Sequence, residues 1–184
     1  MIGQEPAEFT DQTTTTFHFS APPEAVWQSL MFYEDVPSRP WPMLRFVLPR
    51  PIRSEGDKRR VGAIVRCTYD RGYLVKRITA VEAPRHLGFE VMEQRLGIES
   101  RVRTCQGTYD LRAAEGGTDV VLTTYYAGRL RPRALWRVME RYVCHRVHLH
   151  ILMGMRDRLI THVPAVSAAT VAADAIDTAR AASP

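Results

Sequence analysis

Residues 132–162 read PRALWRVMERYVCHRVHLHILMGMRDRLITH, and they predict one long helix. Pro132 suits the first turn of a helix, about thirty residues follow without another proline, and Pro164 would end the helix. With about 100° of rotation per residue, a broad arc of this helix is apolar, and we expect the arc to face the core. Its members are Leu135, Trp136, Val138, Met139, Tyr142, Val143, Val147, Leu149, Met153 and Ile160.

The opposite side of the predicted helix is polar. It carries Arg133, Arg137, Glu140, Arg141, Cys144, His145 and His148. Arg146, His150 and Asp157 lie instead near the middle of the apolar arc. Because burying such groups is costly unless they are paired, they are the first candidates for function. Asp157 lies near the helix end, where we expect surface ion pairs with Arg156 or Arg158.

The length and composition of the chain indicate one globular domain. A chain of 184 residues can bury roughly 70% of its unfolded surface around a single core. It has no apolar run of about 18 residues and no secretion leader, so we expect a cytoplasmic protein without a membrane span. Three widely spaced cysteines favour reduced thiols over a disulfide framework or a zinc module.

The positive charge says little about partners. The net charge is +5, but 23 of the 25 basic residues are arginine, a bias typical of a high-GC bacterial genome. One basic cluster is Lys58-Arg59-Arg60. A second comprises Arg129, Arg131, Arg133, Arg137 and Arg141. Neither cluster has interleaved aromatic side chains for stacking on bases, so nucleic-acid binding is not favoured.

The segments before the helix predict a strand, a short helix and an antiparallel meander. Residues 1–12 form an irregular, flexible lead-in, and 13–19 form a strand rich in threonine and phenylalanine. Ser20-Ala-Pro-Pro-Glu then starts a short amphipathic helix. The proline-rich segment 34–51 is too apolar for solvent and covers a core or a cavity mouth. Period-two alternation then predicts strands at 61–69, 73–82, 86–92, 99–113 and 118–128.

This order of elements predicts an α+β helix-grip fold over residues 13–162. A curved antiparallel sheet would wrap around the long C-terminal helix, because each element then buries its apolar face once. We expect the alanine-rich residues 163–184 to form a weak helix or a disordered tail.

Several motifs support a family resemblance. They are FHFSAPPEAVW (17–27), Val61-Gly-Ala, KRITAVEAPRHLGFEV (76–91), GTYDL (107–111), GGTDVVL (116–122) and the terminal helix. In this order they resemble the START-like, or SRPBCC, superfamily of Bet v 1-like helix-grip proteins, of the polyketide cyclase/dehydratase and lipid-transport type. The resemblance implies an internal cavity for a hydrophobic ligand. It does not imply one reaction, since similar proteins include carriers, aromatase/cyclases and co-chaperones.

Strand alternation in the resembling family places Tyr109 inward, and counting back by twos adds Arg103 and Arg101 to the same face. The next strand and the helix complete the expected ligand-binding wall with Leu122, Thr124, Tyr126, Trp136, Met139, Val143 and Val147. Two alternatives stay open for the arginines. They lie in solvent, or a β-bulge reverses which side chains face inward.

If the protein is an enzyme, Arg146 and His150 are the catalytic candidates. They lie one turn apart, so the arginine could hold an enolate while the histidine moves a proton, as cyclisation or dehydration requires. Alternatively, Arg146 pairs with Glu90 or Glu99 and His150 donates to a backbone carbonyl.

Metal binding, cofactor binding and nucleotide chemistry are not expected. Cys144, His145 and His148 have helical ligand spacing, but Arg137 and Arg141 share their stripe and no further ligands are near in sequence. The chain also lacks a phosphate-binding glycine motif and a nucleophile elbow. The predicted function is binding of a polyketide, lipid or isoprenoid-like molecule, as a carrier or as a cyclase/dehydratase. The alternative is a protein-interaction module of the same fold.

Overall fold

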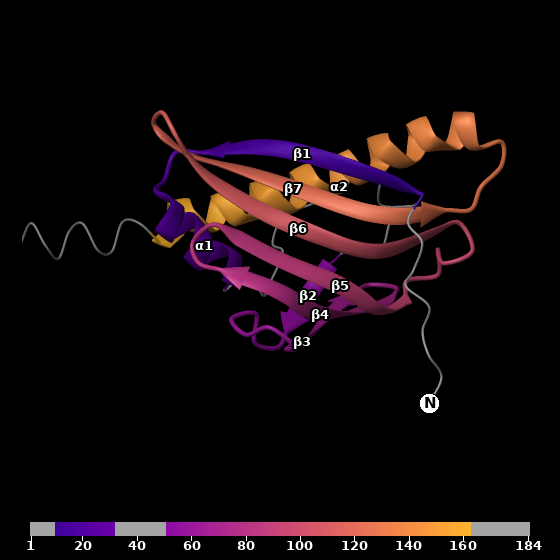
Figure 1. Cartoon of the computed structure of the whole chain (residues 1–184), viewed down its shortest axis with the longest axis horizontal. Helices are drawn as coiled ribbons and strands as arrows, with labels where there is room; N and C mark the ends of the chain where they lie inside the picture. The colour runs from indigo at the N-terminus through magenta and orange to yellow at the C-terminus, as the bar shows by residue number, and fades with distance from the viewer. Residues whose placement is uncertain (1–9, 32–50, 163–184) are drawn as a thin grey trace, which may run out of the picture.

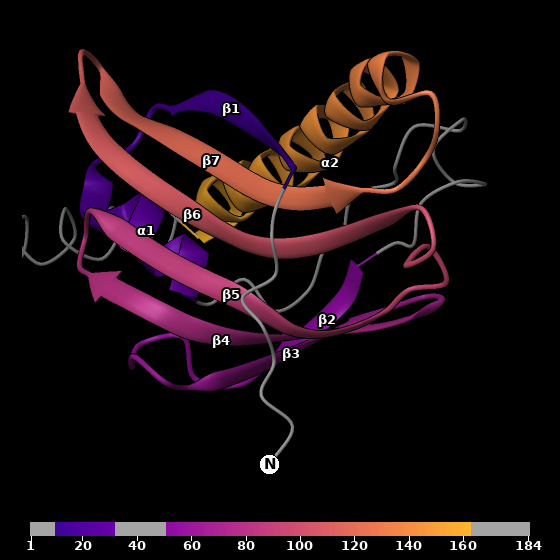
Figure 2. The same cartoon turned by 45° about the vertical axis from the view of Figure 1, so that its right-hand side comes forward.

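The computed structural model describes residues 10–31 and 51–162 of the chain. In this part, a curved sheet wraps around one side of a long helix, which confirms the α+β helix-grip prediction (Figures 1 and 2). The elements are β1 (Asp11–Phe19), α1 (Pro23–Met31), β2 (Pro51–Glu55), β3 (Ile64–Tyr69), β4 (Gly72–Glu82), β5 (His86–Arg95), β6 (Val102–Ala114), β7 (Gly117–Gly128) and α2 (Arg133–His162).

The sheet has seven antiparallel strands in the order β1-β7-β6-β5-β4-β3-β2. Turns and short loops join consecutive strands from β2 to β7. The last strand, β7, then pairs with β1, which forms the other edge of the sheet. β1 begins at Asp11, two residues before the predicted start of this strand. The sequence pattern missed β2, because its residues PIRSE show no apolar alternation and include a proline that suits an edge strand. Apart from Pro51, the proline-rich segment lies outside the described residues, as does the alanine-rich tail.

The apolar core occupies one end of the space between sheet and helix. Phe19, Val26 and Val120 from β1, α1 and β7 meet Leu152 and Met155 from the second half of α2, and all five are at most 1% exposed. A hydrogen bond of 3.1 Å from the Ser29 hydroxyl to the carbonyl oxygen of Met155 ties α1 to α2. The first half of α2 therefore lies outside this core, over the other end of the sheet.

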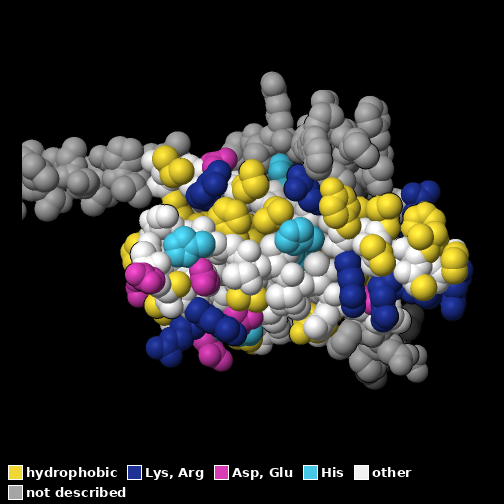
Figure 3. Space-filling model, turned by 90° about the horizontal axis from the view of Figure 1, so that it is seen from above, with side chains coloured by type: hydrophobic (Ala, Val, Ile, Leu, Met, Phe, Trp, Pro, Cys, Tyr) yellow, Lys and Arg dark blue, Asp and Glu magenta, His cyan; other side chains and the backbone are white. Residues whose placement is uncertain are grey.

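The prediction that the apolar arc of α2 faces the core was wrong for most of that arc. Leu135 and Val138 are 66% and 69% exposed, whereas Glu140 and His148 on the polar side are 7% and 2% exposed. Figure 3 shows hydrophobic side chains on the outer surface beside basic ones at the end of the molecule where α2 begins. The helix turns its polar stripe toward the sheet because the inner face of β1 is itself polar.

That inner face carries the buried residues Asp11, Thr13 and Thr15 before it becomes apolar at Phe19. α2 packs on β1 and β7, so its polar side chains pair with the polar groups of β1. An apolar stripe in the same place would leave those groups of β1 unsatisfied. Pairing of polar groups, rather than the apolar arc, therefore sets the rotation of α2 about its axis.

Replacing Gly117 by Ala is expected to destabilise the fold by about 1–3 kcal/mol. A Cβ atom at Gly117 would overlap the backbone carbonyl of Phe19 at the end of β1, and the backbone cannot move away as a flexible side chain could. Chemical denaturation of this variant and of Gly116→Ala measures the effect. Gly116 has a φ of 75° but open space around it, so its replacement costs only backbone strain. A loss of less than about 1 kcal/mol in Gly117→Ala would contradict the clash at Gly117.

Candidate functional site: a cavity between the sheet and α2

A cavity of about 480 Å³, here called the main cavity, lies between the inner face of the sheet and the first half of α2. Its walls are mostly apolar. Strands and the turn after β5 contribute Leu74, Phe89, Leu96, Ile98, Val102 and Leu122. The loop after β7 contributes Leu130, and α2 contributes Trp136, Met139, Val143, Val147 and Ile151. Its polar lining residues are Tyr69, Lys76, Arg101, Thr104, Tyr109, Thr124, Tyr126, Glu140, Cys144 and His148.

Most of the predicted ligand-binding wall lines this cavity. The residues in common are Arg101, Tyr109, Leu122, Thr124, Tyr126, Trp136, Met139, Val143 and Val147. One flank of the apolar arc of α2 thus faces the cavity, although the rest of the arc faces outward. Arg103 is not among the lining residues, and Val102 and Thr104 are there instead. The register of β6 against β7 shifts between Thr104 and Gln106, so a bulge at Cys105 reverses the alternation beyond it.

Neither catalytic candidate of the sequence analysis lines the main cavity. Arg146 and His150 lie on the same side of α2 as the exposed Tyr142 and Met153. Because α2 is rotated about its axis so that its polar stripe is buried, both residues face away from the cavity. Asp157 pairs with Arg156 at 3.2 Å, as expected for the surface near the helix end.

A smaller cavity of about 80 Å³, here called the side cavity, adjoins the main one. The two share Tyr69, Lys76, Phe89, Tyr109 and Ile151 as lining residues. Beyond them the side cavity extends along β2, β3 and α1, where its lining residues are Leu30, Arg53, Ser54, Lys58, Val65, Cys67, Ile78 and Leu87.

A buried polar cluster closes the main cavity on the side of β1. The Nδ1 atom of His148 lies 3.0 Å from the Thr15 hydroxyl, and its Nε2 atom lies 2.8 Å from the Thr124 hydroxyl. The Thr15 hydroxyl is also 2.8 Å from Nδ1 of His145. Because a neutral imidazole donates from one nitrogen and accepts at the other, the two threonines satisfy both nitrogens of His148 without charging it.

Burial keeps His148 neutral. It lowers the pKa of His148 from 6.5 to about 4, and the electrostatic interactions with His145 and Lys76 act in the same direction. Burial likewise raises the pKa of the Cys144 thiol to about 11. His148 is therefore a neutral imidazole at pH 7, and Cys144 is a protonated thiol without the reactivity of a thiolate.

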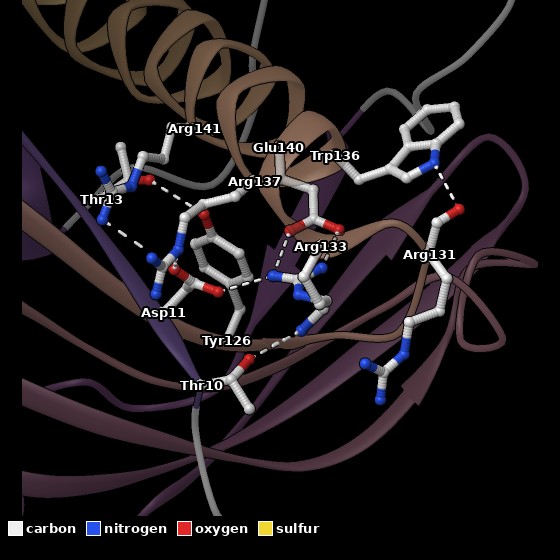
Figure 4. A network of polar contacts seen from close by, with 11 residues as sticks. Thr10, Asp11, Thr13, Tyr126, Arg131, Arg133, Trp136, Arg137, Glu140 and Arg141 are labelled. Atoms are coloured by element: carbon white, nitrogen blue, oxygen red, sulfur yellow. Dashed lines mark hydrogen bonds and ion pairs between the residues drawn. The ribbon is translucent and has the colours of Figure 1, made fainter.

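A network of charges closes the other end of the cavity, where α2 begins (Figure 4). Arg133 donates to Asp11 at 2.6 Å and to both carboxylate oxygens of Glu140, at 2.9 and 3.0 Å. Arg137 donates to the second oxygen of Asp11 at 2.5 Å. Burial acts to raise the pKa of Asp11, but the hydrogen bonds and charges of Arg137 and Arg133 outweigh it and lower the pKa overall. The carboxylate of Asp11 is therefore ionised at neutral pH, and both carboxylates are engaged within the protein.

The comparisons with known proteins agree with this architecture. The family model described as polyketide cyclase/dehydrase and lipid transport matches residues 10–148. The chain belongs to this family. The match also confirms the resemblance to the SRPBCC superfamily. No curated protein matches the chain in sequence.

Solved structures share the fold at low sequence identity. The chain is similar to the Zhui aromatase/cyclase from Streptomyces sp. R1128, with 17% identity, a TM-score of 0.60, and coverage of 84% of this chain and 96% of that one. It is similar to TTHA0849 from Thermus thermophilus, with 17% identity, a TM-score of 0.56 and coverage of 82% and 98%. The Aha1 dimer from Colwellia psychrerythraea has 13% identity, a TM-score of 0.55 and coverage of 82% and 96%.

Sequence reasoning missed Lys76, Glu140 and His148 as cavity residues. A signal for the two helical residues was present, since the inner positions of 11–15 are polar and require a polar helical face opposite. Lys76 is flanked two residues away by Leu74 and Ile78, so strand alternation alone would have placed it inward.

No helix in the described part of the chain is long and apolar enough to cross a bilayer.

Proposed function

We propose that this protein binds one apolar small molecule in the main cavity. The observation that carries the proposal is a volume of about 480 Å³ enclosed by mostly apolar walls with a few polar groups. Small-molecule sites in proteins are typically about 300–1,000 Å³ with this kind of lining. The family description, with its polyketides and lipids, and the aromatase/cyclase among similar structures support a ligand of this class.

The geometry favours binding and carrying over acid-base catalysis. His148 is the histidine in the cavity wall, but both of its nitrogens contact threonine hydroxyls, and its pKa of about 4 makes it a weak base. A general base works best when its pKa lies near the working pH. Arg146 and His150, the catalytic candidates of a cyclase, do not line the cavity. The proposed role is therefore that of a carrier or binding protein.

Replacing Val147 by Trp is expected to weaken ligand binding at least about tenfold, because the larger side chain fills the cavity. Val147 lines the cavity from α2, whereas Val138 on the same helix is 69% exposed. Val138→Trp therefore adds the same bulk outside the cavity and serves as the matched control. Fluorescence titration with the neutral dye N-phenyl-1-naphthylamine measures affinity, and circular dichroism checks that both variants fold. Equal affinity in the two variants would overturn the proposal.

A further inference from the structure

The chain has only two lysines among its 25 basic residues, and both line the side cavity. Lys58 donates a hydrogen bond to the carbonyl oxygen of Leu30 at 3.4 Å. Lys76 lines the main cavity as well, at the junction of the two. The junction between the cavities is therefore positively charged.

Lys76 points inward because of its place in β4. Leu74 and Ile78, two residues before and after it, are 4% and 3% exposed and lie on the inner face of the sheet. Strand alternation puts Lys76 on the same face. Its Nζ atom lies 4.1 Å from the centroid of the Phe89 ring, which is a lining residue of both cavities. The ammonium group is thus held over an aromatic wall rather than extended into solvent.

Within residues 10–31 and 51–162, no carboxylate forms an ion pair with Lys76. Glu140 is the one acidic residue among the described lining of the two cavities. Arg133 already donates to both of its carboxylate oxygens. A contact with an aromatic face offsets part of the cost of removing an ammonium from water, but an anion offsets more.

Tyr109 presents a second polar group at the same junction. Its side chain is 8% exposed, lines both cavities and lies with its ring centroid 6.2 Å from that of Phe89. No other described residue forms a hydrogen bond with its hydroxyl group. Burial raises the pKa of Tyr109, so the hydroxyl keeps its proton and can donate.

We propose that the ligand of the main cavity carries an acidic group, such as a carboxylate or an enolate, which pairs with Lys76 and accepts a hydrogen bond from Tyr109. The apolar body of the ligand occupies the space between the sheet and α2. This inference rests on the proposed function and names the class of ligand as acidic amphiphiles. A hydrogen bond between an anion and an ammonium group is stronger than one between neutral groups, and a second hydrogen bond from the hydroxyl group would fix the orientation of the anion.

Two dyes with the same skeleton test this inference. 1-Anilinonaphthalene-8-sulfonate carries an anion that N-phenyl-1-naphthylamine lacks. We expect Lys76→Met to weaken binding of the sulfonate dye about 10- to 100-fold and to leave the neutral dye within a few-fold. Lys76→Arg keeps the charge and retains most of the preference. Arg112→Met removes one positive charge from an exposed position on β6 and is expected to change neither affinity.

The outcomes separate this inference from the proposed function. If Lys76→Met weakens both dyes equally, or neither, the acidic-ligand inference is wrong while cavity binding stands. If Val147→Trp leaves both dyes bound as in the wild type, the dyes do not occupy the cavity, and both proposals fail. If Lys76→Met does not fold, Lys76→Arg and Lys76→Gln replace it, and the inference requires the preference for the sulfonate to survive in the first and to disappear in the second.

Discussion

Replacing Asp11 by Asn is expected to lower the free energy of unfolding by about 3 kcal/mol. The side chain of Asp11 is 1% exposed and accepts hydrogen bonds from Arg133 at 2.6 Å and Arg137 at 2.5 Å. Loss of its charge leaves Arg133, whose side chain is 24% exposed, with Glu140 as its remaining acidic partner. The loss also detaches the start of β1 from the first turns of α2. Urea denaturation followed by circular dichroism measures the change.

Asp119→Asn is the matched control for this substitution. Asp119 also lies on a strand and pairs with His18 at 2.8 Å, but both side chains are more than 40% exposed. Exposed pairs contribute about 0–1 kcal/mol, so the control is expected to lose little. A loss of less than about 1 kcal/mol in Asp11→Asn would show that the network does not hold the strand and helix together.

The network around Asp11 also makes the stability of the fold depend on pH at acidic values. Since the pKa of Asp11 in the folded state is below its ordinary value of 3.8, the carboxylate stabilises the fold fully above that pH. The contribution is lost as the pH falls through the lowered pKa. It therefore affects acid unfolding below about pH 3.8.

Lowering the pH from 6.5 to 4 is expected to remove about 3 kcal/mol of stability through His148 alone. The pKa of this histidine is lowered to about 4 in the fold, from 6.5 in the unfolded chain. Between these values the unfolded state binds the extra proton, so protonation favours unfolding. The contribution is fully present above pH 6.5 and disappears as the pH approaches 4.

The variant His148→Gln tests this dependence, because an amide keeps hydrogen-bonding capacity but does not titrate. The difference in unfolding free energy between the wild type and this variant is expected to change by about 3 kcal/mol across the interval. A His148 resonance that titrates near pH 6.5 in NMR spectra would contradict the buried, neutral cluster.

The fold could be predicted from sequence because its signals are local. Alternation in residues 61–128, the turns between strands and the long proline-free run after Pro132 each specify an element without reference to the others. The inward positions Leu122, Thr124 and Tyr126 follow from alternation in the same way. The edge strand β2 was missed because its residues carry no alternation, and its pairing with β3 is what defines it.

The residues of the site could not be predicted from local patterns, because their positions depend on contacts between elements that are far apart in the chain. The apolar arc predicted the wrong face of α2 because the partner of that helix is a polar stretch of β1, about 130 residues earlier in the chain. Arg103 was misplaced by one bulge, which no local pattern marks. The importance of Lys76 depends on which acidic residues lie near it in space, and sequence spacing does not show this.

Native mass spectrometry of the protein purified from the organism that encodes it, followed by solvent extraction, tests whether the main cavity holds an apolar acidic ligand. We expect one extractable organic molecule per chain in the wild type and in Val138→Trp, and none in Val147→Trp. We also expect this molecule to be mostly apolar and acidic. Equal occupancy in the two tryptophan variants, or a wild type that stays empty when offered a panel of apolar acids, would contradict it.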